Sequence, residues 1–151
     1  MNNMNNSRKY KVLIVDDYVP LGEMLALLFE ARGPFIARFI DDFDQAVDEA
    51  RRFKPDICVL DLWEDSTEEM RGQEVAAVFL DDPVLCRIPI VYYTGSKATK
   101  QGNIVKRADF HGGMRISLPQ TRPNQGPSEI IKKGMTQPLD LMNELVRILE
   151  G

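Results

Sequence analysis

Side chains that could bind a cation and accept a phosphoryl group stand at the ends of three short apolar runs. Asp16 and Asp17 follow one run, Asp61 follows a second, and Thr94 follows a third. If these runs are strands of one parallel sheet, their carboxyl ends meet at one crevice, where ligands bind. Three carboxylates crowded there would repel one another, so a positive counter-charge is expected. Mg²⁺ fits best, because it takes hard oxygen ligands from carboxylates and phosphates.

Asp61 is the candidate nucleophile at this crevice. A carboxylate can form an acyl phosphate when a cation and an ammonium group balance the charge on the phosphoryl oxygens. Lys133 is the candidate ammonium, with Lys132 as its fallback, because both close a short β-branched run. Zinc is not expected, since His111 is the single histidine and the two cysteines lack metal-ligand spacing.

Alternating apolar patterns predict the elements that would position these residues. Short runs rich in β-branched residues predict five strands, at 11–15, 35–40, 57–60, 88–93 and 128–133. Apolar residues spaced by three and four predict helices around 21–29, 43–53, 75–80 and 139–149, with a weaker candidate at 103–110. Strands that alternate with helices pair in parallel through right-handed crossovers. We therefore expect an α/β fold, a doubly wound five-stranded parallel sheet with helices on both faces.

The fifth strand has two candidates. One is 114–118 and the other is 128–133. We favour the second, because it is β-branched, ends in lysine and lies just before the closing helix. The stretch 114–126 then becomes a loop, since Pro119, Pro123 and Gly126 interrupt it. This choice implies an insertion before the last strand.

Three motifs together resemble the response-regulator receiver family of two-component signalling. They are VLIVDD at 12–17, ICVLDL at 57–62 and IPIVYYTG at 88–95. They occur in that family's order and at about its spacings, and the resemblance runs from about residue 9 to residue 150. It implies a flavodoxin-like receiver fold with helices on both faces of the sheet.

The resemblance also implies a role for each site residue. Asp61 would be the phosphoacceptor and a ligand of Mg²⁺. Asp17 would bind the ion directly, Asp16 would help through water, and the main-chain carbonyl of Trp63 would supply a further ligand. Thr94 and the lysine would complete the site.

The chain departs from the family pattern at three places. Gly72 comes later after the acceptor than in the family, and Asp65 stands in place of a proline, so this loop is longer and more acidic. The family's lysine would fall near Leu118, where the chain has none. Either the lysine is lost or an insertion displaces it to Lys133. Ile130 also stands where the family has an aromatic switch residue.

Composition narrows the class of protein. The formal net charge is −4, the pI is about 5.1 and no basic cluster is visible, so we expect no nucleic-acid contact. Residues 1–8 form an Asn-rich stretch that we expect to be a disordered tail, with residues 9–151 as a single receiver domain. Without a signal peptide or an apolar run of about 20 residues, we expect a cytoplasmic protein that does not contact the membrane. Cys58 and Cys86 lie in apolar segments and are expected to be buried and reduced.

The expected function is that of a stand-alone receiver and not of an enzyme, because the closing helix ends one residue before Gly151. Its expected partners are a histidine kinase or histidine phosphotransfer protein, which would donate the phosphoryl group, and a downstream protein target. One alternative is a small Mg²⁺-dependent phosphohydrolase with an aspartyl nucleophile, although Trp63 stands where its general acid would be needed. Another is a degenerate receiver that acts only as a binding module.

Overall fold

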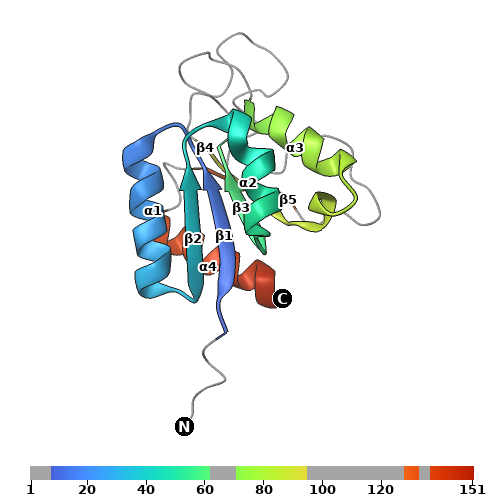
Figure 1. Cartoon of the computed structure of the whole chain (residues 1–151). Helices are drawn as coiled ribbons and strands as arrows, with labels where there is room; N and C mark the ends of the chain where they lie inside the picture. Colours follow the sequence, from blue (N-terminus) through green and yellow to red (C-terminus); the bar gives the residue numbers. More distant parts are fainter. Residues whose placement is uncertain (1–7, 62–70, 95–127, 133–136) are drawn as a thin grey trace.

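The computed structural model describes residues 8–61, 71–94, 128–132 and 137–151 (Figure 1). A five-stranded sheet runs through the middle of this part, with the strand order β2-β1-β3-β4-β5 and every neighbouring pair parallel. The strands are β1 (Tyr10–Val15), β2 (Phe35–Ile40), β3 (Ile57–Leu60), β4 (Ile90–Thr94) and β5 (Ser128–Lys132).

Helices cover both faces of the sheet. Helices α1 (Val19–Arg32) and α4 (Pro138–Glu150) pack on one face, and α2 (Ala46–Phe53) and α3 (Arg71–Asp81) pack on the other. Two single turns of 3₁₀ helix, η2 (Phe43–Gln45) and η3 (Leu85–Arg87), precede α2 and β4. None of the helices in the described ranges is long and apolar enough to cross a bilayer.

Strand β1 shows why the sheet is buried on both sides. Its side chains alternate between two cores: Leu13 and Val15 pack with the α2–α3 layer, and Val12 and Ile14 pack with the α1–α4 layer. All four are fully buried. The sequence of a central parallel strand is therefore a continuous apolar run, because both of its faces are buried away from water.

The predicted doubly wound parallel sheet with helices on both faces is confirmed. The favoured candidate for the last strand is also confirmed, since β5 covers Ser128–Lys132 and pairs with β4. The fourth strand begins two residues later than predicted, because the N–H of Ile88 still bonds to the carbonyl of Leu85 at 3.0 Å and closes η3. The competing strand at 114–118, the helix candidate at 103–110, the insertion and residues 1–7 lie outside the described residues.

Both cysteines are buried and free, as the sequence predicted. Burial without a compensating charge raises the pKa of the Cys58 thiol to about 12. A thiol in this state is a poor nucleophile, so Cys58 serves packing and not chemistry.

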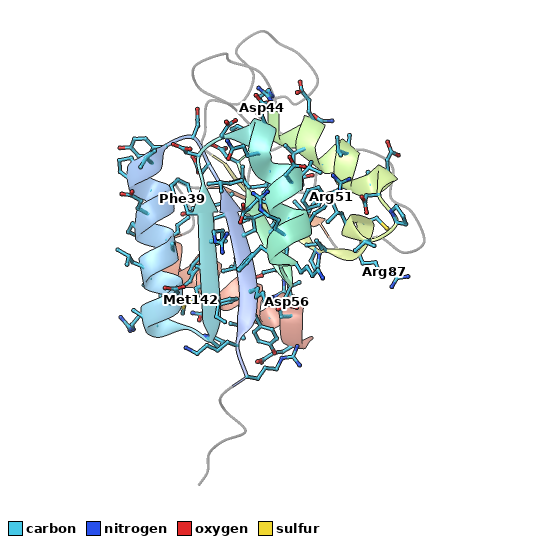
Figure 2. The ribbon with its side chains drawn as sticks, in the orientation of Figure 1. Phe39, Asp44, Arg51, Asp56, Arg87 and Met142 are labelled. Carbon is cyan, nitrogen blue, oxygen red and sulfur yellow. The ribbon has the colours of Figure 1, made fainter. Side chains whose placement is uncertain are left out.

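Helix α1 approaches β2 so closely at Gly22 that no side chain fits. A Cβ atom there would lie 2.0 Å from a ring carbon of Phe39, whose side chain lies between α1 and β2 (Figure 2). Replacing glycine by alanine in a helix normally stabilises it by about 1 kcal/mol. Here we expect Gly22→Ala to lower the free energy of unfolding by about 1–2 kcal/mol, because overpacking outweighs that gain.

Urea denaturation of a double-mutant cycle tests this expectation. In a Phe39→Ala background the ring is gone, so Gly22→Ala should become neutral or stabilising. The same destabilisation in both backgrounds would mean that the Phe39 ring is not the obstacle.

A buried carboxylate ties α2 to the edge strand β2. Glu49 is only 6% exposed and accepts hydrogen bonds from Arg38 of β2 and from Arg52, the latter at 2.7 Å. The hydrogen bond from Arg52 and the charges of both arginines hold the pKa of Glu49 below its usual value, although burial opposes this.

A lowered pKa means that Glu49 stabilises the fold above its unfolded pKa, near 4.5, and loses this effect as the pH falls through the folded value. We expect Glu49→Gln to lower the free energy of unfolding by about 1 kcal/mol at neutral pH, since both arginines are largely exposed and their charges are screened. Denaturation at neutral and acidic pH measures the difference. If the difference in the free energy of unfolding between the parent and Glu49→Gln stayed constant at low pH, the role of the carboxylate charge would be contradicted.

Candidate functional site

The sheet has its topological switch point between β1 and β3. The chain passes from β1 outward to β2 and then returns to place β3 on the other side of β1. Crossovers on the two sides leave in opposite directions, so a crevice opens at the carboxyl ends of these two strands. Asp16 and Asp17 directly follow β1, and Asp61 directly follows β3.

Backbone hydrogen bonds set the positions of two of these aspartates. Val15 and Leu60 are register partners across β1 and β3. The N–H of Asp61 extends this ladder by bonding to the carbonyl of Val15 at 2.9 Å, and the N–H of Asp16 bonds to the carbonyl of Ile40 at 3.3 Å. The sheet itself therefore holds both acidic residues at its edge.

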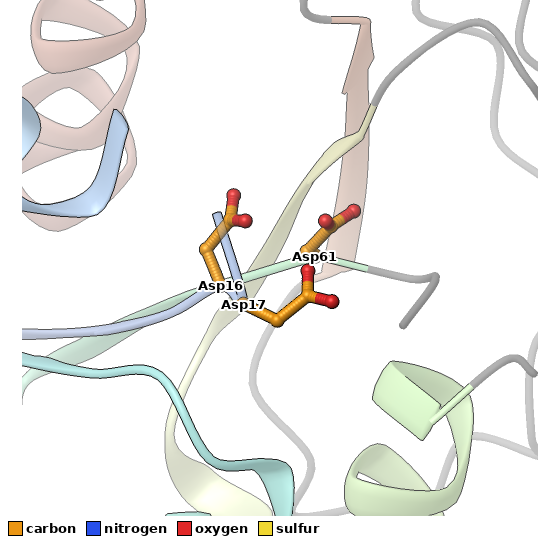
Figure 3. A group of neighbouring side chains, drawn as sticks. All are labelled: Asp16, Asp17 and Asp61. Carbon is orange, nitrogen blue, oxygen red and sulfur yellow. The ribbon is translucent and has the colours of Figure 1, made fainter. Parts of the chain in front are cut away.

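The three carboxylates gather in one cluster (Figure 3). One oxygen from each of Asp16, Asp17 and Asp61 lies within 4.8 Å of the others. Asp16 and Asp61 are 3% and 6% exposed, and Asp17 is half-buried. Burial reduces the ability of water to screen the charges, so the ionised cluster requires a cation nearby.

The donor set fits a hard divalent cation. All three donors are carboxylate oxygens, without nitrogen or sulfur, and such ligands suit Mg²⁺ and not zinc. Asp16, Asp17 and Asp61 are therefore the residues that would hold the ion. When bound, it would neutralise negative charge on the oxygens around it.

The amide of Tyr18 adds a contact that the sequence analysis missed. It donates a hydrogen bond to a carboxylate oxygen of Asp16 at 2.9 Å, in the turn that leads into α1. This bond orients the Asp16 side chain. Aspartate often accepts a hydrogen bond from the backbone amide two residues later in a turn. The sequence therefore contained the signal for this contact, because Tyr18 follows Asp16 by two residues.

The remaining predicted site residues are placed only in part. Thr94 ends β4 and pairs in register with Lys132, which ends β5. Their backbones thus lie at the same edge of the sheet as the acidic cluster. Trp63 and Lys133 lie outside the described residues, so the predicted carbonyl ligand and the preferred lysine stay predictions.

Comparisons with known proteins give relatives of one kind. The chain is 32% identical over 94 residues to the DNA-binding response regulator MtrA of Mycobacterium tuberculosis, a match that covers 62% of this chain and 38% of that protein. The MtrA protein of Mycobacterium leprae is 33% identical over 91 residues, covering 60% and 37%. The match thus spans under two fifths of the length of these relatives. No family model matches the chain.

Solved structures share the fold. The receiver domain of the Francisella response regulator 1452 superposes with a TM-score of 0.66 at 14% identity, covering 94% of this chain and 98% of that one. A LuxR-family two-component response regulator from Aurantimonas gives a TM-score of 0.63 at 19% identity, covering 95% and 86%.

A doubly wound α/β domain with an aspartate cluster at its switch point is thus the class of protein that the fold and the site define. Its sequence relatives are named as response regulators and its structural neighbours include receiver domains, and both support the resemblance to the receiver-domain family. The relatives are named as DNA-binding regulators, so the expectation of no nucleic-acid contact finds no support in them. Stand-alone status, the cytoplasmic location and the absence of enzymatic activity stay predictions.

Proposed function

We propose that the chain accepts a phosphoryl group on Asp61 and signals through the change that follows. The observation that carries this proposal is the cluster of Asp16, Asp17 and Asp61, whose carboxylate oxygens lie within 4.8 Å of one another at the switch point. Only Asp61 of these follows β3, the strand that resembles the family's acceptor strand. The proposed partners are a histidine kinase or histidine phosphotransfer protein and a downstream protein target.

The proposed transfer follows from the chemistry of a carboxylate. An oxygen of Asp61 attacks phosphorus, a P–O bond forms to give an acyl phosphate, and the P–N bond of a phosphohistidine donor breaks. The donor imidazole keeps the electron pair and takes up a proton. A backbone hydrogen bond to Val15 of β1 holds Asp61 in place, so little reorganisation is needed at the moment of attack.

Direct labelling tests the proposal. The protein is incubated with Mg²⁺ and acetyl phosphate or phosphoramidate, and its intact mass is then measured. We expect a gain of one phosphoryl group that hydroxylamine removes, because hydroxylamine cleaves acyl phosphates. A protein that hydrolyses the donor continuously without an adduct would instead support the phosphohydrolase alternative. A protein that does neither would support a degenerate receiver.

Lys133 is the proposed cation that senses the phosphoryl group. Its neighbour Lys132 ends β5 opposite Thr94, so the chain reaches the edge of the sheet that carries Asp61. We expect Lys133→Ala to leave labelling of Asp61 intact but to remove the change in hydrogen exchange or oligomeric state that labelling causes. Lys132→Ala is the matched control and should keep that change. Equal effects of the two substitutions, or none from either, would contradict the placement of the lysine.

A further inference from the structure

A pocket of about 330 Å³ lies on the α2–α3 side of the sheet, far from the acidic cluster along the strands. It opens between the last turn of α2 and the segment that joins α3 to β4. Pro55 and Ile88, which line it, come just before β3 and β4. The pocket therefore lies at the amino ends of these strands, whereas Asp61 lies at the carboxyl end of β3.

The walls of the pocket are mainly apolar. Ala50, Pro55 and Leu85 are buried, and Ile88 is partly buried. Val84 stands at the rim, with 72% of its surface exposed. An apolar group that entered would lose contact with water without displacing any of these side chains.

An ion pair across the pocket holds two of its walls together. One carboxylate oxygen of Asp82 accepts from the amides of Val84 and Leu85 at 2.8 and 2.9 Å. Its other oxygen pairs at 2.9 Å with the guanidinium of Arg51, which is labelled on α2 in Figure 2. The amides, with Leu85 first, and Arg51 also keep the pKa of Asp82 low, so the bridge stays ionised near neutral pH. The pocket is thus formed before a ligand arrives.

Lys54 leaves an uncompensated positive charge at the same pocket. It directly follows α2 in the left-handed conformation, with φ of 56°, and its N–H bonds to the carbonyl of Ala50 at 2.9 Å. Its side chain is exposed, and within the described ranges no carboxylate pairs with its ammonium. Arg51 is already engaged by Asp82 and, at 3.8 Å, by Asp48. The ionic group that the pocket offers to a ligand is therefore a cation, although the whole chain has a net charge of −4.

We propose that this pocket binds a small organic carboxylate with an apolar body, its carboxylate on Lys54 and its body against Leu85 and Ile88. The volume lies at the lower end of the range of small-molecule sites, about 300–1,000 Å³. A protein partner fits the observations less well. A stable interface buries about 800 Å² on each partner. Among the residues that line the pocket, only Val84 is a large apolar residue that is exposed, so the pocket offers too little apolar surface for such an interface.

Titration of the ¹⁵N-labelled, unphosphorylated protein with 4-phenylbutyrate tests the proposal, and 4-phenylbutyramide serves as the uncharged control. We expect saturable shifts of the amide signals of Lys54, Val84 and Ile88 with the carboxylate. The amide should bind about threefold to fivefold more weakly, as loss of an exposed ion pair implies. Shifts that do not saturate by about 20 mM, the range expected for a small fragment, would overturn the proposal.

Three variants separate the proposed contacts. Lys54→Gln keeps the backbone and should weaken binding of the carboxylate to the level of the amide. Arg32→Gln, which removes an exposed charge from α1 on the other face of the sheet, should not. Val84→Glu places a carboxylate at the rim and should abolish binding while leaving the Arg51–Asp82 bridge intact, because Val84 contacts Asp82 only through its backbone amide. Equal binding by all four proteins would overturn the proposal. The site is independent of Asp61, so these results stand whether or not Asp61 is phosphorylated.

Discussion

Asp61→Asn is expected to abolish labelling by acetyl phosphate while leaving the fold intact. The amide is nearly isosteric with the carboxylate, but only the carboxylate can attack phosphorus. Asp61 is buried, and its backbone amide bonds to β1 at 2.9 Å, so the substitution keeps the ladder that positions it. Intact mass after incubation with Mg²⁺ and the donor should therefore show the unmodified protein alone.

A second expectation for Asp61→Asn concerns its stability. Removing one of three crowded charges relieves repulsion, so without Mg²⁺ the variant should unfold at the same or a higher urea concentration than the parent. Asp41→Asn is the matched control, since Asp41 is exposed at the same edge, just beyond β2. It should leave labelling unchanged. Retained labelling of Asp61→Asn would place the acceptor elsewhere.

The acidic cluster could be predicted from sequence because two local signals agreed. Fully buried parallel strands must be apolar throughout, so a polar residue directly after such a run marks where the strand leaves the sheet. Asp16, Asp17 and Asp61 each follow such a run, and the alternation with helices required parallel pairing. Their proximity then followed from topology and needed no knowledge of side-chain packing.

Contacts between distant segments could not be predicted in this way. Glu49 belongs to a helix rich in charged residues. No feature of the sequence around it indicates that Arg38 of β2 donates a hydrogen bond to its carboxylate. The Arg51–Asp82 bridge joins two elements 31 residues apart, and the left-handed turn at Lys54 that shapes the pocket depends on how α2 meets β3. Periodicity reports which face of an element is apolar, but it does not report which charged group on another element will lie opposite.

Asp17→Ala is expected to abolish Mg²⁺ binding at the concentrations that saturate the parent. Mg²⁺ gives up its water reluctantly, and with one of three carboxylates gone too few hard oxygens remain to compensate. Calorimetric titration, or titration followed through the fluorescence of Trp63, the single tryptophan, measures the loss. Asp41→Ala removes the same charge from the same edge outside the cluster and should bind the ion as the parent does.

Labelling of the Asp17→Ala protein then separates the roles of the two aspartates. Asp61 is still present, so the nucleophile is intact. Any loss of labelling should therefore come from loss of the cation that balances the negative charge of the phosphoryl oxygens. We therefore expect little labelling at Mg²⁺ concentrations that saturate the parent and partial recovery when Mg²⁺ is raised further, whereas Asp61→Asn should not recover at any concentration. Unchanged Mg²⁺ binding by Asp17→Ala would mean that the metal site lies outside the cluster, even if Asp61 proved to be the acceptor.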